Sequence, residues 1–276
     1  MDYYLDSEFL EGTQTKRFFG KTKPTIDLIS IALVSDDNRE YYAISKDFNL
    51  KEAWNRFDEK VEIMSGDMRN LFPKGRKYKE YWIRENVLKP IFDEWKLNNN
   101  SKIVKLGLPI SLNESKFNYK NFKYCIQCIG KSNKQIAKEI CLFIDARYVD
   151  KNNPDKGYMY PSGTSIKEVK TTNVKFHAYY ADYDWVVFCW LFGKMIDLPK
   201  GFPMYCFDLK QLEDVVYEEK KASYYGNSKT EAIKHTGHFI NKMSNHPDYP
   251  KQKNEHNALD DAKFCKNLHA FLKSVK

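Results

Sequence analysis

Two acidic residues near the amino terminus have the spacing of a cation site. Asp6 and Glu8 lie two positions apart in the segment from Tyr3 to Leu10, which has the composition of a β-strand. Because alternate side chains leave a strand on the same face, both carboxylates can converge on one divalent ion. A polar, solvent-exposed face near a strand end is the simpler explanation of such a pair. The aromatic and aliphatic neighbours favour a central strand instead, where two carboxylates need a partner.

A third carboxylate lies on a predicted amphipathic helix that closes the chain, over residues 257–273. At about 100° per residue, Asp261 shares one helix face with Cys265, Leu268 and Leu272. A carboxylate directed at an apolar face is unfavourable unless it is hydrogen-bonded or bound to a metal. Asp261 is therefore either a hydrogen-bonded core residue or a metal ligand, and its geometry favours the ligand.

Two further residues could complete such a site. Asp184 stands at the start of an apolar segment, residues 185–196, that is predicted to be a helix buried on all sides. An N-cap aspartate is the ordinary explanation, although a position directly after a strand also places Asp184 at a sheet edge where ligands collect. His256 precedes the predicted helix cap Asn257, on a loop. An exposed loop histidine is the simpler interpretation of His256 taken alone.

The elements that must position these residues alternate along the chain. Three strands joined by short turns come first, and helices and strands then follow one another, which predicts an α/β fold with a mixed β-sheet flanked by helices on both faces. Pro90 should kink or divide the second helix, and Ser132 should cap the third. The predicted strands are 3–10, 25–34, 40–45, 175–180 and 204–207, and the predicted helices are 50–58, 82–95, one that begins at 132, 185–196, 208–219 and 257–273.

Composition narrows the function classes. The chain has 276 residues, 42% of them hydrophobic, which is enough for a sizeable core. A mean hydropathy of −0.67 and the lack of a long apolar run predict no membrane span, and the first residues do not have the pattern of a signal peptide, so we expect a cytoplasmic protein. The net charge of +8 favours a polyanionic partner or serves solubility alone.

Cysteines and basic segments give weaker signals. The six cysteines are scattered, and although Cys125 and Cys128 have half of a zinc-site spacing, no second pair follows, so free thiols are expected. The segment 16–23 interleaves cations with aromatic rings, which fits equally a loop that binds nucleic acid and a solvated hairpin with two core phenylalanines. A second basic segment, residues 74–81, is better explained as a solvated run of charges.

Taken together, the acidic motifs resemble those of the DEDDh exonucleases of the RNase H-like superfamily. Three motifs stand in the required order, namely Asp6-Ser7-Glu8, then Tyr180-Ala181-Asp182-Tyr183-Asp184, then His256 with Asp261. Asp182 occupies the variable position of the second motif, so the resemblance assigns Asp184 to the metals. It implies one exonuclease domain over residues 1–276, enlarged by insertions at 11–24, 98–130 and 147–172.

Several segments are closer to the small bacterial 3′-to-5′ exoribonucleases of the mycobacterial type. They are residues 4–9, 27–31, 39–43, 82–88 and 255–259. This resemblance implies a hydrolase that removes nucleoside 5′-monophosphates from the 3′ end of single-stranded RNA. It also allows a homodimer, since dimers are common among the relatives.

The resemblance assigns a role to each candidate residue. Asp6, Glu8, Asp184 and Asp261 would hold two Mg²⁺ or Mn²⁺ ions, and His256 would act as general base. The predicted contacts to nucleic acid are Lys16, Arg17, Phe18, Phe19, Lys21 and Arg84. Two alternatives stay open: a 3′-to-5′ DNA exonuclease with the same catalytic residues, and a nuclease-like RNA-binding module without turnover.

Overall fold

The computed structural model describes residues 1–14, 23–63, 74–106, 116–144, 173–225 and 242–275. The chain divides into two compact units. The first unit comprises residues 1–9, 28–45 and 131–276, and the second comprises residues 10–27 and 46–130. The predicted insertion at 147–172, and residues 226–241, lie outside the described residues.

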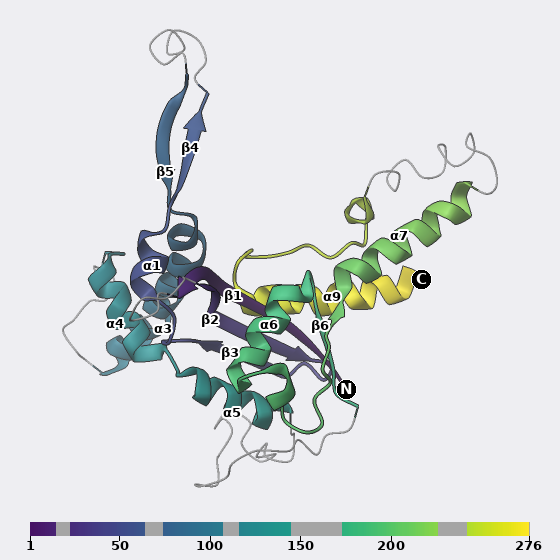
Figure 1. Ribbon diagram of the computed structural model, residues 1–276, viewed down its shortest axis with the longest axis horizontal. Helices are drawn as coiled ribbons and strands as arrows, with labels where there is room; N and C mark the ends of the chain where they lie inside the picture. The colour runs from purple at the N-terminus through teal and green to yellow at the C-terminus, as the bar shows by residue number, and fades with distance from the viewer. Residues whose placement is uncertain (15–22, 64–73, 107–115, 145–172, 226–241, 276) are drawn as a thin grey trace. The chain divides into compact units, whose positions relative to one another are not determined.

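A five-stranded mixed sheet organises the fold (Figure 1). Its strand order is β3-β2-β1-β6-β7, in which β2 and β3 are antiparallel while β6 is parallel to both β1 and β7. The strands are β1 (Asp2–Gln14), β2 (Lys23–Ser35), β3 (Glu40–Ile44), β6 (Lys175–Ala178) and β7 (Phe207–Asp208). The α/β class and the mixed sheet are as predicted, and they are consistent with an RNase H-like fold.

The helices of the first unit cover both faces of this sheet. They are α5 (Asn133–Ile144), α6 (Ala181–Phe192), α7 (Leu209–Tyr225) and α9 (Ala258–Val275), with short 3-10 turns η5 (Met195–Asp197) and η6 (Met243–Asn245). Helix α5 contacts α6, and α7 lies beside α9 (Figure 1). The predicted cap of α5 is confirmed, because Ser132 Oγ accepts a hydrogen bond of 3.2 Å from the Gln135 N–H.

Side chains of β1 alternate between the two faces of the sheet, and their contacts show which helix covers each face. Tyr3 points to one face, where its ring packs 5.9 Å from Phe143 of α5 and 6.0 Å from Phe176 of β6. Tyr4 points to the other face and belongs to a buried cluster with Leu268 and Leu272 of α9. Since side chains two residues apart share a face, Asp6 and Glu8 lie on the same face as Tyr4.

The second unit is built around aromatic residues. The helical elements are α1 (Leu50–Asn55), η1 (Arg84–Leu88), α3 (Lys89–Leu106) and α4 (Tyr119–Ile129), and β4 (Asp58–Glu62) pairs with β5 (Arg76–Glu80) as an antiparallel two-stranded sheet. The ring of Phe117 lies 4.8 Å from that of Trp54 and 5.4 Å from that of Phe92. The segment 98–130, which the sequence left unassigned, thus contains the end of α3 and all of α4.

Two predicted helices of the second unit have different bounds in the structure. Helix α1 ends at Asn55 rather than Asp58, because Asp58 pairs with Glu80 in the two-stranded sheet. The helix predicted at 82–95 begins with a π-helical turn, in which the Lys89 N–H donates to the Arg84 carbonyl five residues earlier. Pro90 has no N–H to donate, and the wider turn directly precedes it.

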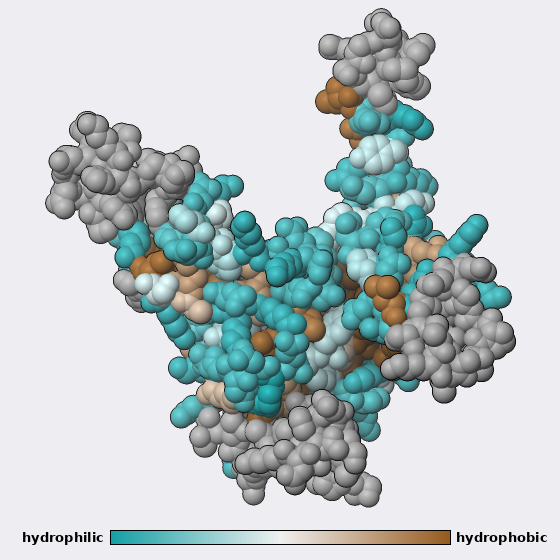
Figure 2. All heavy atoms as spheres, turned by 180° about the vertical axis from the view of Figure 1, so that it is seen from behind, coloured by the Kyte–Doolittle hydropathy of each residue, from teal (hydrophilic) through white to brown (hydrophobic). Residues whose placement is uncertain are grey.

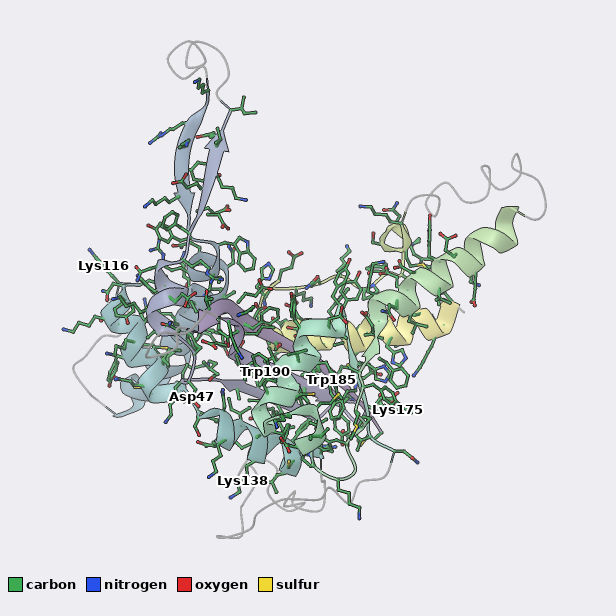
Figure 3. The ribbon with its side chains drawn as sticks, in the orientation of Figure 1. Asp47, Lys116, Lys138, Lys175, Trp185 and Trp190 are labelled. Atoms are coloured by element: carbon green, nitrogen blue, oxygen red, sulfur yellow. The ribbon has the colours of Figure 1, made fainter. Side chains whose placement is uncertain are left out.

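The apolar helix predicted at 185–196 is also corrected. Helix α6 begins at Ala181 and ends at Phe192, before Gly193, whose φ of 120° a non-glycine residue rarely adopts. The helix is not buried on all sides, since Trp190 is 48% exposed. Trp185, by contrast, stacks 5.1 Å from Phe188; Figure 3 labels both tryptophans on α6. The strand predicted at 204–207 is only the two-residue β7, and the helix after it is longer than predicted.

Cysteine state and surface character agree with the composition. All six cysteines are free thiols, and Cys125 is buried whereas Cys128 is exposed. Among the residues coloured in Figure 2, hydrophilic ones predominate, and hydrophobic ones appear in small patches. Within the described residues, no helix is both long and apolar enough to cross a membrane. The single-domain interpretation and the three insertions stay predictions.

Core packing beneath the sheet gives a first prediction. Phe143 is fully buried and contacts Tyr3 and Tyr41, so Phe143→Ala leaves a cavity and should lower the free energy of unfolding by about 3–5 kcal/mol. Denaturant unfolding measures this change. The exposed Lys134 of the same helix supplies the control, since Lys134→Ala should change stability by less than about 0.5 kcal/mol. Equal stability of the two variants would contradict the described packing.

Candidate active site

Strand β1 carries two carboxylates past the end of its neighbour. In the parallel register Tyr4 lies opposite His177, and β6 ends one residue later at Ala178. Asp6 and Glu8 therefore emerge where β6 has stopped, at the carboxyl ends of two parallel strands. This edge of an α/β sheet is where ligands commonly bind.

Helix α9 supplies the third carboxylate from its first turn. Asp261 is 7% exposed, as its position on the apolar face predicted. The Asn257 side chain caps the helix by accepting from the Leu259 and Asp260 N–H groups at 3.1 and 3.3 Å. Gln252 Nε2 donates to Asp261 Oδ1 at 2.6 Å. The amide fixes the orientation of the carboxylate before any ligand binds.

Asp184 comes from the first turn of α6 on the other side of the sheet. Its Oδ1 accepts hydrogen bonds from the Ser7 N–H at 2.8 Å and from Ser7 Oγ at 2.5 Å. The expected N-cap role is wrong, because Tyr180 occupies that position in a left-handed conformation with φ 56°. Asp184 is buried, whereas Asp182 is exposed. The family resemblance assigned Asp184, not Asp182, to the metals, and of these two aspartates only Asp184 is buried.

His256 lies at the turn that precedes α9, with a left-handed φ of 69°. This conformation directs its backbone N–H to Asp261 Oδ2 at 2.9 Å. Its ring Nδ1 lies 4.0 Å from Glu8 Oε1. Residues in sparsely populated backbone conformations concentrate at functional sites, and His256 and Tyr180 both lie next to the carboxylates.

The structure brings the predicted carboxylates together. Asp6, Glu8 and Asp261 each offer an oxygen atom within 4.8 Å of the others. Asp184 lies close enough to raise the pKa of both Asp6 and Glu8 by charge repulsion. In the part of the chain that the structure describes, no lysine or arginine forms an ion pair with any of the four.

Burial and mutual repulsion make these groups difficult to ionise. Desolvation and then repulsion from Asp261 raise the pKa of Glu8 to about 8. Desolvation raises the pKa of Asp184 to about 7 although the Ser7 hydrogen bonds lower it, and desolvation followed by repulsion from Asp184 raises the pKa of Asp6. Burial also raises the pKa of Asp261 against the hydrogen bond from Gln252. The cluster therefore lacks countercharge.

The donor set fits a hard divalent cation. Carboxylate oxygens are the ligands that Mg²⁺ and Mn²⁺ prefer, and a bound cation removes the repulsion that raises these pKa values. Asp6, Glu8 and Asp261 would hold such an ion directly. Asp184 already uses Oδ1 for Ser7 and has Oδ2 available to complete the set.

The structure does not test the predicted contacts to nucleic acid. Lys16, Arg17, Phe18, Phe19 and Lys21 lie outside the described residues. Arg84 belongs to the second unit, where its guanidinium lies 3.8 Å from the Tyr81 ring centroid and 3.1 Å from Glu85. Their roles in binding stay predictions. The basic residues of β5 are exposed, as a solvated run of charges requires.

Two residues that support the site were not identified from the sequence. Ser7 carried a usable signal, because it lies between Asp6 and Glu8 and must point to the opposite face, toward α6. Gln252 carried none, since a polar residue in a polar segment says nothing about its partner.

Comparisons with known proteins show similarity over part of the chain. Two proteins from two strains of Mycobacterium tuberculosis, each named 3′-5′ exoribonuclease, are 42% identical to this chain over 53 residues. The aligned stretch covers 19% of this chain and 26% of each relative, about a quarter of their length. No protein-family model matches the chain.

The raised pKa values predict an unusual dependence of stability on pH. Between the ordinary pKa of 4.5 and its value of about 8 in the fold, Glu8 holds a proton that the unfolded chain releases. The free energy of unfolding in chelator should therefore fall as pH rises through this window. Glu8→Gln should be more stable than the parent at pH 8 in chelator, and added Mg²⁺ should stabilise the parent more than the variant. Thermal unfolding measures both effects, and a parent as stable as the variant under every condition would contradict the repulsion.

Proposed function

We propose that this protein is a metal-dependent 3′-to-5′ exoribonuclease with a DEDDh-type active site. Its catalytic residues would be Asp6, Glu8, Asp184, His256 and Asp261. The observation that carries the proposal is the convergence of two half-buried and two buried carboxylates, from three separate elements, at a sheet edge with no lysine or arginine partner among the described residues. The partial similarity to proteins named 3′-5′ exoribonucleases supports the choice of reaction.

The chemistry follows from what phosphodiester hydrolysis needs. When bound, two divalent ions lower the pKa of the attacking water and neutralise charge on the leaving 3′ oxygen. The carboxylates of Asp6, Glu8, Asp184 and Asp261 would hold the ions. Because the four charges would otherwise repel a phosphate, substrate should bind weakly at this site without the ions.

His256 has the position of a general base. Its ring is 39% exposed and lies 4.0 Å from Glu8, at the rim of the carboxylate cluster. A histidine is suited to take the proton from the attacking water near neutral pH. The Asp261 carboxylate accepts the His256 N–H and thereby fixes the turn that presents the ring.

Single-stranded RNA is the proposed substrate. Strand polarity and the preference for RNA rest on the similarity to exoribonucleases, and the products would be nucleoside 5′-monophosphates. A 2′-hydroxyl offers both a donor and an acceptor by which RNA can be distinguished from DNA. A 3′ end within a duplex must fray before it can enter the site, so blunt duplexes should be poor substrates.

Loss of one ligand should abolish most turnover. Asp261→Asn keeps the shape of the side chain but removes a charge that holds the ions, so hydrolysis of labelled RNA in Mg²⁺ or Mn²⁺ should nearly cease while the melting temperature is retained. Asp182→Asn, at the exposed aspartate of the second motif, is the matched control and should stay active. Full activity in chelator, or a fully active Asp261→Asn enzyme, would rule out the two-metal mechanism.

Removal of the proposed base should slow the reaction without unfolding the chain. His256→Ala should lower the turnover rate by roughly 100-fold or more, the usual scale for a general base. Because hydroxide replaces the base at higher pH, the variant's rate should rise with pH more steeply than the parent's. An unchanged rate at neutral pH would show that another group accepts the proton.

A ladder experiment tests direction and substrate together. Single-stranded RNA labelled at its 5′ end should give products that shorten one nucleotide at a time, with matched DNA degraded more slowly. An internal cut as the first product would reject the exonuclease mechanism. Faster loss of DNA would favour a DNA exonuclease, and binding without products in Mg²⁺ and Mn²⁺ would favour an RNA-binding module.

A further inference from the structure

A second cluster of metal-binding side chains lies away from the proposed active site. It consists of Asp2 at the start of β1, His177 on β6 and His269 on α9, each of which offers one atom within 4.8 Å of the others. All three belong to the first compact unit. The proposed nuclease mechanism uses none of them.

His177 is a buried imidazole that forms no hydrogen bond with the part of the chain that the structure describes. Its residue is 5% exposed, and its ring stacks between Tyr4 at 5.4 Å and Phe207 at 5.2 Å. Among the described residues neither ring nitrogen has a hydrogen-bond partner, since the 3.6 Å from Nε2 to Asp2 Oδ2 is too long for one. Buried polar atoms are almost always partnered. The aromatic stack therefore holds in place a ring whose Nε2 faces the Asp2 carboxylate.

Hydrogen bonds around His269 select which of its nitrogens is available. The Tyr4 hydroxyl lies 3.2 Å from Asp36 Oδ1 and 3.0 Å from His269 Nδ1. A carboxylate only accepts, so the hydroxyl proton goes to Asp36 and the hydroxyl oxygen accepts from the Nδ1–H of His269. This arrangement leaves the lone pair on Nε2. Metal-binding histidines are commonly oriented by such a hydrogen bond from their other nitrogen.

Burial also keeps both rings in the form that binds metals. Desolvation, followed by repulsion from His269, lowers the pKa of His177 to about 4. Desolvation lowers the pKa of His269 as well. Both imidazoles are therefore neutral at physiological pH, as metal ligands must be.

We propose that Asp2, His177 and His269 bind a transition-metal ion of the Zn²⁺ class. In a tetrahedral zinc site with bonds of about 2 Å, ligand atoms lie about 3.4 Å apart. His177 Nε2 and Asp2 Oδ2 are already separated by 3.6 Å, and small side-chain rotations bring the third atom, within 4.8 Å, to the same spacing. Three protein ligands leave one position for water.

The two sites differ in the metal that each prefers. Two imidazoles and one carboxylate suit Zn²⁺ and its neighbours in the first transition series, whereas an all-carboxylate set suits Mg²⁺ and Mn²⁺. Lys273 is the present ionic partner of Asp2, with 3.7 Å between Nζ and Oδ2. Its side chain is 60% exposed, so it can turn into solvent when the ion binds. The ion would link β1, β6 and α9, and it should stabilise this unit.

Titration with Zn²⁺ tests the site in full-length protein. Asp6→Asn and Asp261→Asn together serve as the background, because they weaken competing binding at the carboxylates. Calorimetry should show one tight Zn²⁺ per chain, and zinc-edge X-ray absorption should show two imidazoles per ion. His177→Phe keeps the stacked ring but removes both nitrogens, and it should weaken binding by at least about 100-fold; Tyr4→Phe should weaken it by roughly 10-fold.

Controls separate loss of the site from loss of the fold. His246→Ala, which removes a histidine outside the cluster, should bind Zn²⁺ like the background. If His177→Phe does not fold, Asp2→Asn replaces it. The zinc-edge X-ray absorption spectrum of the background protein, in which Asp2, His177 and His269 are unchanged, then shows independently whether imidazoles bind the ion. Absence of a tight site, a spectrum without imidazole ligands, or unchanged affinity in the folded His177→Phe protein would overturn the proposal. None of these results depends on nuclease activity.

Discussion

Repulsion among half-buried and buried carboxylates is the constraint on which the candidate site depends. Asp6, Glu8 and Asp261 place oxygen atoms within 4.8 Å of one another, and Asp184 adds a fourth negative group nearby. In an interior of low dielectric such a cluster destabilises its own ionised form. A fold that served stability alone would pair these groups with lysine or arginine. In the function proposed for this chain, bound cations would relieve the repulsion, so that folding and metal binding would be linked at one place.

The scaffold holds the cluster together without neutralising it. Strand β1 extends beyond β6, so that Asp6 and Glu8 reach an open edge, and the first turns of α6 and α9 deliver the two other aspartates. Helix amino termini favour negative charge, which offsets part of the repulsion. Neutral donors then orient the carboxylates, with Ser7 on Asp184 and Gln252 on Asp261. Neutral donors orient the carboxylates but leave the negative charge of the cluster unchanged.

Periodicity in the sequence correctly predicted the placement of site residues where that placement depends on a single strand or helix. The two-residue spacing placed Asp6 and Glu8 on one face, and helical geometry placed Asp261 on the buried side of α9. Features that depend on tertiary contact were missed or wrong. The alternative in which Asp184 caps a helix is wrong, because that helix starts four residues earlier than predicted, at Ala181. No local pattern indicates that Gln252 donates a hydrogen bond to Asp261. Pairing between distant segments also shortened the helix before Asp58.

We infer that the carboxylates converge in order to hold divalent ions. A crystal structure of the protein soaked in Mn²⁺ tests it directly, because anomalous scattering locates manganese without reference to activity. The account predicts two peaks about 4 Å apart, contacted by Asp6, Glu8, Asp184 and Asp261, which are absent from the Asp261→Asn variant. The inference would be contradicted if the four carboxylates stayed close together but no manganese lay between them, at a Mn²⁺ concentration high enough to saturate a metal-dependent nuclease.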